Sequence, residues 1–400
     1  MWFQRDIERS IRENHDPIQI FRGPRQVGKS SLILHLDEGF REVSLDDPGL
    51  RELAERDPEL FLRQFGSDKL FIDEAQYAPR LFPSLKRRAD LYSRDASRAP
   101  ETIVRLTGSN QLVMDRRIKE SLAGRASFFD MNTLSVAEIV ATRSMPIQDI
   151  LFTGGWPGLH AHGRTDVKKY LDDYINSYVE KDIVLGAGIH KQFEFLKFIR
   201  LLAGRVGQLL DLASLGRDAG VDSKTIKDWI SILERMQLIA LVQPFSTNLS
   251  SRLVKAPKVY FLDTGLACRL QGWTSADQII TSPQQGPLFE NLVYAELHKT
   301  NQNHQLGWQI CHWRSRDGEE IDFLVELSRT SRVFIEAKVS AHRPWDPHRL
   351  REVTRVFGSK APPLLCCHQE GDRVFNQNVP IAHLQQLMLE AGANPKRLRA

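Results

Sequence analysis

The chain has 400 residues, of which 42% are hydrophobic and 26% charged, and its formal net charge is +4. This length accommodates two or three domains, and the composition is that of ordinary globular protein. The first residues are charged and amphipathic, and no stretch is apolar over a bilayer-spanning length, so we expect a cytoplasmic protein with no membrane partner. The four cysteines form no C-x-x-C pair, which favours reduced thiols over disulfides or a zinc site.

The first motif along the chain is a glycine-rich loop, GPRQVGKS at 23–30, which fits the template G-x-x-x-x-G-K-[ST] at every fixed position. An apolar strand is predicted before it at 17–21, and an apolar helix after it. We expect the loop amides to hold the phosphates of ATP, Lys29 to reach the β- and γ-phosphates, and the Ser30 hydroxyl to hold Mg²⁺. The residues assigned to nucleotide contact are Gly23, Gln26, Val27, Gly28, Lys29, Ser30 and Ser31.

An apolar strand predicted at 69–72 ends in two acids, Asp73 and Glu74. In a P-loop ATPase the first acid binds Mg²⁺ together with the loop hydroxyl of Ser30, and the second orients and deprotonates the attacking water. We therefore predict Asp73 as a Mg²⁺ ligand and Glu74 as the catalytic base. Apolar strands that end in acids are common, so the assignment of Asp73 and Glu74 depends on the glycine-rich loop being present as well.

A strand at 102–107 is expected to lie between the two strands just described, with Ser109 or Asn110 contacting the γ-phosphate or the attacking water. The alternative is a glycine turn in which Asn110 only caps the next helix.

Arg125 precedes a strand predicted at 126–131 and is expected beside the same edge of the sheet as the loop. It is the candidate arginine finger, acting on the γ-phosphate within the chain or from a neighbouring subunit of a homo-oligomer. The alternative is an ordinary surface arginine.

The segment 209–236 predicts a helix-turn-helix pattern, followed by a wing-like stretch at 238–244. In DNA-binding versions the N-terminal residues of the second helix enter the major groove, which assigns Lys224 and Lys227 to DNA. Winged helices also dock proteins, and this alternative stays open.

Toward the C-terminus, a helix predicted at 286–297 carries Glu290, and segments 319–325 and 333–339 predict paired strands. Side chains two residues apart on a strand share a face. Glu320 and Asp322 therefore share a face of the first strand, and Glu336 and Lys338 share a face of the second.

Asp322 on the first of these strands, and Glu336 with Lys338 on the second, resemble the acid and Glu-x-Lys signature of restriction-like nucleases. The resemblance implies Mg²⁺ held by Glu290, Asp322 and Glu336, with Lys338 as the partner of water and phosphate. The alternative is a solvated strand face with an ordinary Glu336–Lys338 ion pair.

Together the motifs resemble the AAA-type ATPases of bacteria and archaea that carry a C-terminal domain of unknown function. The matching segments are 23–30, 72–76, 106–109, 122–125, 154–157, 178–183, 257–266 and 318–323. The family's usual loop threonine is Ser30 here, which keeps the hydroxyl. The resemblance implies an α/β fold: a five-stranded parallel P-loop core, a helical and winged-helix middle domain, and a C-terminal domain similar to restriction endonucleases.

We expect domains at 1–145, 146–250 and 251–400, and two function classes stay open. One is an ATPase acting on or with DNA, and the other is a nucleotide-controlled switch or scaffold whose C-terminal modules bind protein. Segment 73–76 also resembles the acidic box of helicases. A helicase needs a second motor domain with a glutamine- and arginine-rich motif, however, and the sequence after Met131 contains none.

Overall fold

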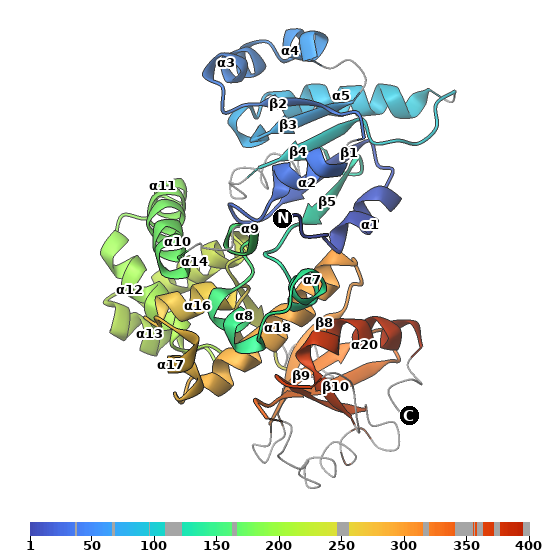
Figure 1. The fold of residues 1–400 in the computed structure, drawn as a ribbon. Helices are drawn as coiled ribbons and strands as arrows, with labels where there is room; N and C mark the ends of the chain where they lie inside the picture. Colours follow the sequence, from blue (N-terminus) through green and yellow to red (C-terminus); the bar gives the residue numbers. More distant parts are fainter. Residues whose placement is uncertain are drawn as a thin grey trace.

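The structure is a computed structural model, and its elements fall into three successive parts of the chain (Figure 1). It describes residues 1–36, 38–65, 69–95, 97–108, 122–161, 166–245, 256–314, 320–340, 355, 357, 363–371 and 377–394. The N-terminal elements are α1 (Ile7–Glu13), β1 (Ile18–Arg22), α2 (Lys29–Leu36), β2 (Arg41–Ser44), α3 (Pro48–Arg56), α4 (Pro58–Phe65), β3 (Leu70–Asp73), η1 (Ala75–Tyr77), α5 (Leu81–Arg94), β4 (Val104–Thr107) and β5 (Ala126–Asp130).

The described N-terminal strands form a parallel sheet in the order β2-β3-β4-β1-β5. β1 and β4 are continuously apolar or buried because helices cover both faces of the sheet. On β1, Ile18 and Ile20 face the core shared with α3, α4 and α5, whereas Phe21 faces α1 and α2. The predicted place of the 102–107 strand, between the other two motif strands, is confirmed. The N-terminal part is a P-loop type α/β fold.

The middle part is helical. Its elements are α7 (Val136–Thr142), α8 (Ile147–Thr153), α9 (Pro157–Ala161), α10 (Val167–Tyr174), the π-helical η2 (Ile175–Ile183), α11 (Val184–Gly186), α12 (Gln192–Ala203), α13 (Leu212–Ala219), α14 (Ser223–Arg235) and β6 (Ile239–Val242). Asp211 and Asp222 begin α13 and α14, because their side chains accept hydrogen bonds from backbone amides of the first turn. α13, a turn and α14 thus form the expected helix-turn-helix arrangement.

The C-terminal part is a second α/β unit. Its elements are β7 (Lys258–Phe261), α16 (Thr264–Leu270), α17 (Ala276–Ile280), α18 (Gln285–Asn303), β8 (Gln309–Arg314), β9 (Glu320–Glu326), β10 (Arg332–Ala337), β11 (Leu364–His368), β12 (Asn378–Pro380) and α20 (Ile381–Ala393). In the described residues β8 to β12 form a mixed sheet in the order β12-β11-β10-β9-β8. β9 is antiparallel to both of its neighbours, and β10, β11 and β12 are parallel.

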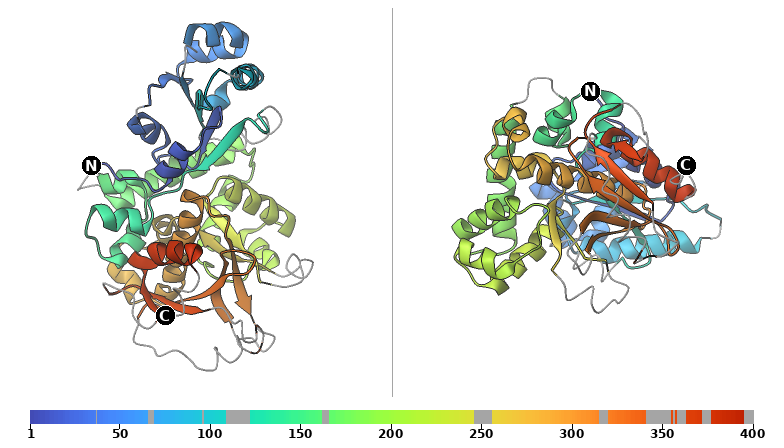
Figure 2. Two further views of the ribbon diagram at one scale, coloured as in Figure 1. Left: turned by 90° about the vertical axis from the view of Figure 1, so that its right-hand side faces the viewer. Right: turned by 90° about the horizontal axis from the view of Figure 1, so that it is seen from below.

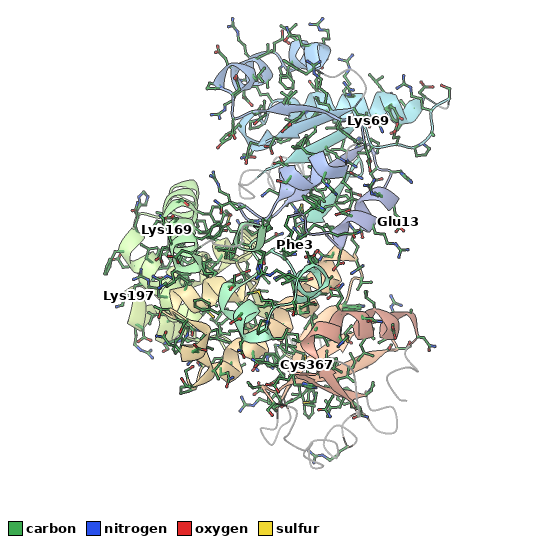
Figure 3. All side chains as sticks on the ribbon, in the orientation of Figure 1. Phe3, Glu13, Lys69, Lys169, Lys197 and Cys367 are labelled. Carbon is green, nitrogen blue, oxygen red and sulfur yellow. The ribbon has the colours of Figure 1, made fainter. Side chains whose placement is uncertain are left out.

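One apolar core joins the middle and C-terminal parts and reaches into the N-terminal part. α18 runs through it and contacts α1, β5, α8, α16, β7, β10 and α20. β6 pairs with β7 across the predicted boundary at 250, which itself lies outside the described residues. Figure 2 shows the sheet of the N-terminal part standing on the other two parts. Phe3, 4% exposed, lies at this junction (Figure 3).

In the described part of the chain, no helix combines the length and apolar character that a membrane span requires. Cys268, Cys311, Cys366 and Cys367 are buried free thiols.

Candidate functional site

The glycine-rich loop connects β1 to α2 at the carboxyl edge of the N-terminal sheet, and its backbone demands its glycines. Gly23 has φ 146°, and a Cβ there would lie 2.1 Å from the Met131 carbonyl oxygen. Gly28 has φ 90°, which residues with a side chain rarely adopt. The strand–loop–helix order predicted from the motif is therefore present.

Lys29 is buried under the loop, with 8% of its surface exposed. Its Nζ donates hydrogen bonds to the carbonyl oxygens of Gly23 (2.9 Å) and Pro24 (2.8 Å). Burial lowers the pKa of Lys29 to about 8, against the opposing effect of the Glu74 and Asp73 carboxylates. The Lys29 ammonium is thus held by two carbonyls of its own loop.

Ser30 and Asp73 come together across the carboxyl edge of the sheet, where the Ser30 hydroxyl donates to Asp73 Oδ1 at 2.9 Å. The hydroxyl of Thr107, at the end of the neighbouring β4, donates to the same oxygen. A carboxylate and a hydroxyl side by side are hard oxygen donors, so these residues fit Mg²⁺. Sequence reasoning assigned no role to Thr107, although its place at the end of the central strand was a usable signal.

Glu74 follows β3 in the left-handed conformation, with φ 55°. Its amide donates to the Thr107 hydroxyl at 3.3 Å, and its carboxylate accepts a hydrogen bond from the buried Gln76 side chain. Backbone and side chain are thus both fixed, which orients the carboxylate at the edge that carries the loop. Ser109, predicted to contact the γ-phosphate, lies outside the described residues.

The structure corrects the expected position of Arg125. Ala126 pairs with Ile18 at the start of β1, whereas the loop follows Arg22 at its end. About 15 Å of strand therefore separates Arg125 from the loop, at roughly 3.3 Å per residue. Its Nε instead contacts Asp90 Oδ1 on α5 at 2.5 Å. The prediction failed because it did not account for β5 being parallel to β1, which places the residue before β5 at the opposite edge.

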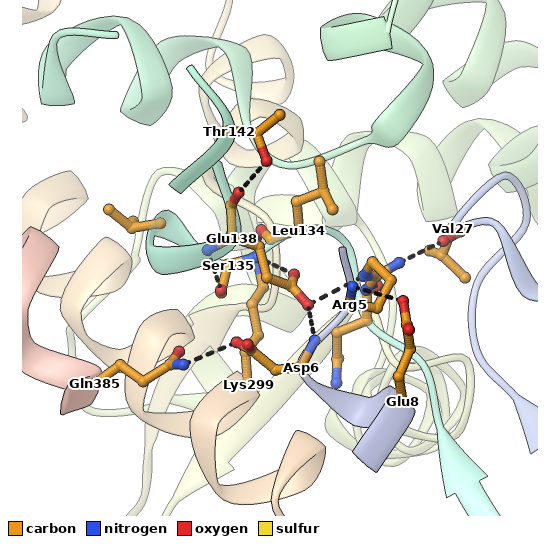
Figure 4. A network of polar contacts seen from close by, with 12 residues as sticks. Arg5, Asp6, Glu8, Val27, Leu134, Ser135, Glu138, Thr142, Lys299 and Gln385 are labelled. Atoms are coloured by element: carbon orange, nitrogen blue, oxygen red, sulfur yellow. Dashed lines mark hydrogen bonds and ion pairs between the residues drawn. The ribbon is translucent and has the colours of Figure 1, made fainter. Parts of the chain in front are cut away.

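Two buried side chains that sequence reasoning missed connect the loop to the rest of the molecule. Arg5 donates to the Val27 carbonyl (3.0 Å), the Asn132 carbonyl (2.7 Å) and the Glu138 carboxylate (3.1 Å) (Figure 4). The Trp156 ring Nε1 donates to the Arg25 carbonyl at 3.3 Å. No local sequence pattern indicates either contact, because the partners lie far apart along the chain.

Glu138 organises the first turn of α7 at this junction. Its carboxylate accepts bonds from the Ser135 and Asp6 amides as well as from Arg5. In the neighbouring α18, Glu296 accepts from the Val136 amide at 2.7 Å. Buried acids at the start of a helix satisfy amides that have no partner within the helix. Residues of the loop, α7 and α18 thus share one polar network.

The acids predicted in the C-terminal part do approach one another. Burial, with the Glu290 and Glu336 carboxylates nearby, raises the pKa of Asp322 well above its usual range. The Lys338 ammonium contacts Glu336 Oε1 at 2.7 Å. Lys258 of β7, which sequence reasoning missed, also lies among these acids.

These residues do not fit a divalent cation. In the described residues, no three His, Cys, Asp or Glu side chains converge as metal ligands. The Lys258 ammonium contacts Glu290 Oε1 at 3.0 Å and Glu320 Oε1 at 2.5 Å, so lysine rather than open space faces both carboxylates. The predicted Mg²⁺ set of Glu290, Asp322 and Glu336 therefore lacks the geometry that it requires.

Lys224 and Lys227 are both exposed on α14. The N-terminal end of that helix also carries Asp222, whose carboxylate accepts from the Thr225 amide at 2.8 Å, and Asp228 is exposed nearby. Both positive and negative side chains are therefore exposed near the start of α14.

Three family descriptions match successive segments of the chain. An AAA domain matches residues 15–140, a domain of unknown function (DUF8612) matches 146–277, and a domain of unknown function (DUF4143) matches 285–387. The AAA match and the parallel sheet support an AAA-type P-loop ATPase. The C-terminal match carries no known function, so the resemblance to restriction endonucleases is not confirmed.

Related proteins cover much of the chain. The uncharacterized protein Rv2008c of Mycobacterium tuberculosis is 29% identical over 315 residues, which is 78% of this chain and 68% of that protein. An uncharacterized protein of Haemophilus influenzae is 22% identical over 269 residues, covering 64% of this chain and 63% of that one. Among solved structures, the Walker-type ATPase PABY2304 of Pyrococcus abyssi matches with TM-score 0.39 and 15% identity, covering 66% and 93%.

Proposed function

We propose that the chain binds ATP with Mg²⁺ and hydrolyses it at the carboxyl edge of the N-terminal sheet. The observation that carries the proposal is the meeting of Ser30, Asp73 and Thr107 beside the buried Lys29. The loop amides and Lys29 bind the phosphates, and Ser30 and Asp73 hold Mg²⁺, which neutralises charge on the β- and γ-phosphates when bound. Glu74, oriented by Gln76, accepts the proton of the attacking water.

In this proposal Arg125 acts as an arginine finger only on the nucleotide of a neighbouring subunit. Arg125 lies at the amino edge of the sheet, remote from the loop of its own chain. Its side chain is 34% exposed, so it is accessible to a second copy. Stacking of copies with the amino edge of one against the loop edge of the next would bring Arg125 to a neighbour's γ-phosphate. A homo-oligomer follows as the active form.

We further propose that the output of the ATP cycle is exerted on DNA through the helix-turn-helix segment of α13 and α14. The exposed Lys224 and Lys227 at the start of α14 support this, since the N-terminal residues of a recognition helix reach the groove. β6 and β7 form an antiparallel pair after α14, in the place of a wing. Nuclease activity is not included, because nothing beyond the Glu-x-Lys pattern supports it.

A nucleotide-controlled switch is the second candidate. Arg5 and Trp156 both donate hydrogen bonds to loop carbonyls; Trp156 belongs to the core of the other two parts, and Arg5 is bonded to Glu138 of α7. A change in loop position on binding ATP would therefore be transmitted to α7 and α18. In this reading ATP sets the arrangement of the parts, and the helix-turn-helix segment and C-terminal unit bind protein.

The two candidates differ in their response to DNA. ATP hydrolysis by the full chain is to be measured alone and with single-stranded, duplex and branched DNA, with Glu74→Gln as the control that binds ATP without hydrolysing it. Stimulation by one of these DNAs supports the first candidate. Steady hydrolysis that no DNA alters supports the switch. Hydrolysis undiminished in Glu74→Gln would refute Glu74 as the base.

A further inference from the structure

The side chain of Lys258 lies at the centre of the acidic cluster of the C-terminal part. Lys258 begins β7 and is 4% exposed. Its Nζ lies 3.0 Å from Glu290 Oε1 on α18 and 2.5 Å from Glu320 Oε1 on β9. A buried ammonium therefore contacts carboxylates from two different elements, α18 and β9.

Three further groups of the protein also bind carboxylate oxygens of the cluster. The Tyr260 hydroxyl, two residues along β7, donates to Glu290 Oε1 at 2.5 Å. The Ala337 amide donates to Asp322 Oδ2 at 2.8 Å, and Lys338 contacts Glu336. Each of these carboxylates thus has at least one oxygen bound by a group of this chain, which is how buried polar groups are usually accommodated.

We propose that the Lys258 ammonium takes the place of a divalent cation in this cluster, so that the C-terminal unit works without a metal. A divalent cation demands several oxygen ligands at about 2.0 to 2.6 Å. To enter, it would have to displace Lys258 from Glu290 and Glu320. The lysine would then stay buried beside a second, larger positive charge, which is costly where water is excluded.

The position of β7 gives this ion-pair cluster a mechanical role. β7 pairs with β6, which follows directly after α14 of the helix-turn-helix segment. The Asn291 side chain accepts from the Phe261 amide (2.7 Å) and donates to its carbonyl (2.8 Å), which binds the far end of β7 to α18 as well. Lys258 and Asn291 together fix the strand pair to the C-terminal sheet and α18. The cluster is a joint between two parts of the molecule.

The test is Mn²⁺ binding to the nucleotide-free full chain, measured by electron paramagnetic resonance and calorimetry in an Asp73→Asn background that silences the P-loop site. With Lys258 present we expect no Mn²⁺ bound at the cluster. Lys258→Met should create a site for about one Mn²⁺ per chain, since Glu290 and Glu320 then lose their shared cation and are free to turn toward a metal. Adding Asp322→Asn should remove that site. Lys168→Met, at an exposed lysine of α10, is the matched control and should bind no Mn²⁺.

Mn²⁺ bound while Lys258 is intact, and lost on Asp322→Asn, would overturn the proposal. A folded Lys258→Met chain that binds no Mn²⁺ would also overturn it. Folding is to be checked by circular dichroism. If Lys258→Met does not fold, Lys258→Gln keeps most of the side-chain length without the charge, and the same two outcomes apply to it. The measurement on the chain that keeps Lys258 shows, without any Lys258 variant, whether Mn²⁺ binds at the cluster.

Discussion

At the carboxyl edge of the N-terminal sheet, individual hydroxyl groups hold Asp73 and the backbone of Glu74 in place. Asp73 Oδ1 accepts from both the Ser30 and Thr107 hydroxyls, and Thr107 also receives the Glu74 amide. Thr107 therefore contacts both the Asp73 carboxylate and the Glu74 backbone. We propose that it positions these two acids.

Replacing Thr107 tests that role. Thr107→Val keeps the shape but removes the hydroxyl, so Asp73 and the Glu74 amide each lose a partner. A buried hydrogen bond contributes about 1 kcal/mol, so we expect kcat for ATP to fall at least roughly fivefold. Thr107→Ser, which keeps the hydroxyl, should restore most of the rate. Equal rates in Thr107→Val and the parent would show that this contact does not position the acids.

The lowered pKa of Lys29 predicts that ATP binding is linked to the uptake of a proton. Its pKa is lowered from 10.5 to about 8 by burial, and phosphate charge would raise it again. ATP binding should therefore take up a proton between roughly pH 8 and 10, and ATP affinity should fall as pH rises through that window.

Calorimetry at pH 7 and pH 9 in buffers of different ionisation enthalpy measures the uptake. We expect none at pH 7 and a clear uptake at pH 9 that disappears in Lys29→Arg, whose guanidinium stays charged. Uptake of the same size in both proteins would assign the proton to another group.

The elements place functional groups at one edge of the sheet or the other. Every described strand of the N-terminal sheet is parallel, so the residue after a strand lies at the loop edge and the residue before it at the opposite edge. Asp73 follows this rule at one edge and Arg125 at the other.

The position of Arg125 predicts complementation between defective copies. Arg125→Ala and Glu74→Gln should each have low ATPase activity, Arg125→Ala with ATP affinity unchanged. Mixing them should restore a fraction of the activity, because some interfaces then combine an intact Arg125 with an intact Glu74. Arg94→Ala, at an exposed arginine at the end of α5, is the control. No recovery in mixtures that do form oligomers would leave Arg125 as a structural partner of Asp90.

Across the whole molecule, the N-terminal part is attached through buried polar contacts as well as apolar packing. Arg5 and Glu138 form an ion pair in which the side chains are 4% and 0% exposed. Arg9 and Glu13, both on α1, form an ion pair whose side chains are 80% and 63% exposed. The chain thus offers a buried pair and an exposed pair for comparison.

Removing Arg5 should destabilise the molecule strongly. Arg5→Met leaves the Glu138 carboxylate buried without its cation, which costs about 3 kcal/mol, whereas Arg9→Met should change little because its pair is in water. Thermal unfolding followed by circular dichroism compares the two. Adding Glu138→Gln to Arg5→Met should recover part of the loss. Equal melting temperatures for the two single variants would contradict the buried network as a source of stability.

The DNA proposal also belongs to the whole molecule. Each phosphate contact releases counterions, so losing Lys224 and Lys227 should weaken duplex binding for all sequences and reduce the slope of log K against log salt by about two. Titration at several salt concentrations measures this slope. Lys168→Ala with Lys169→Ala on α10 is the control with two exposed lysines removed elsewhere. A parental slope in the Lys224→Ala, Lys227→Ala chain would make this segment a protein-docking module.

The sequence by itself determined the local parts. The glycines at 23 and 28, the lysine and serine that follow, and the acids after an apolar strand specify a phosphate loop and its opposing edge, because backbone conformation and strand ends are local properties. The two C-terminal strands were likewise located by their alternation. Asp73 was placed correctly opposite Ser30 for the same reason.

Only the tertiary structure decided which distant groups meet. Thr107 reaches Asp73 across 34 residues, Lys258 reaches Glu290 across 32, and Arg5 reaches Glu138 across 133. Such pairs depend on strand order and helix packing, which local propensity does not fix. Arg125 was assigned to the wrong edge for that reason, and Lys258 went unnoticed because a lysine at the start of a strand becomes part of an acidic cluster only when α18 and β9 are folded around it.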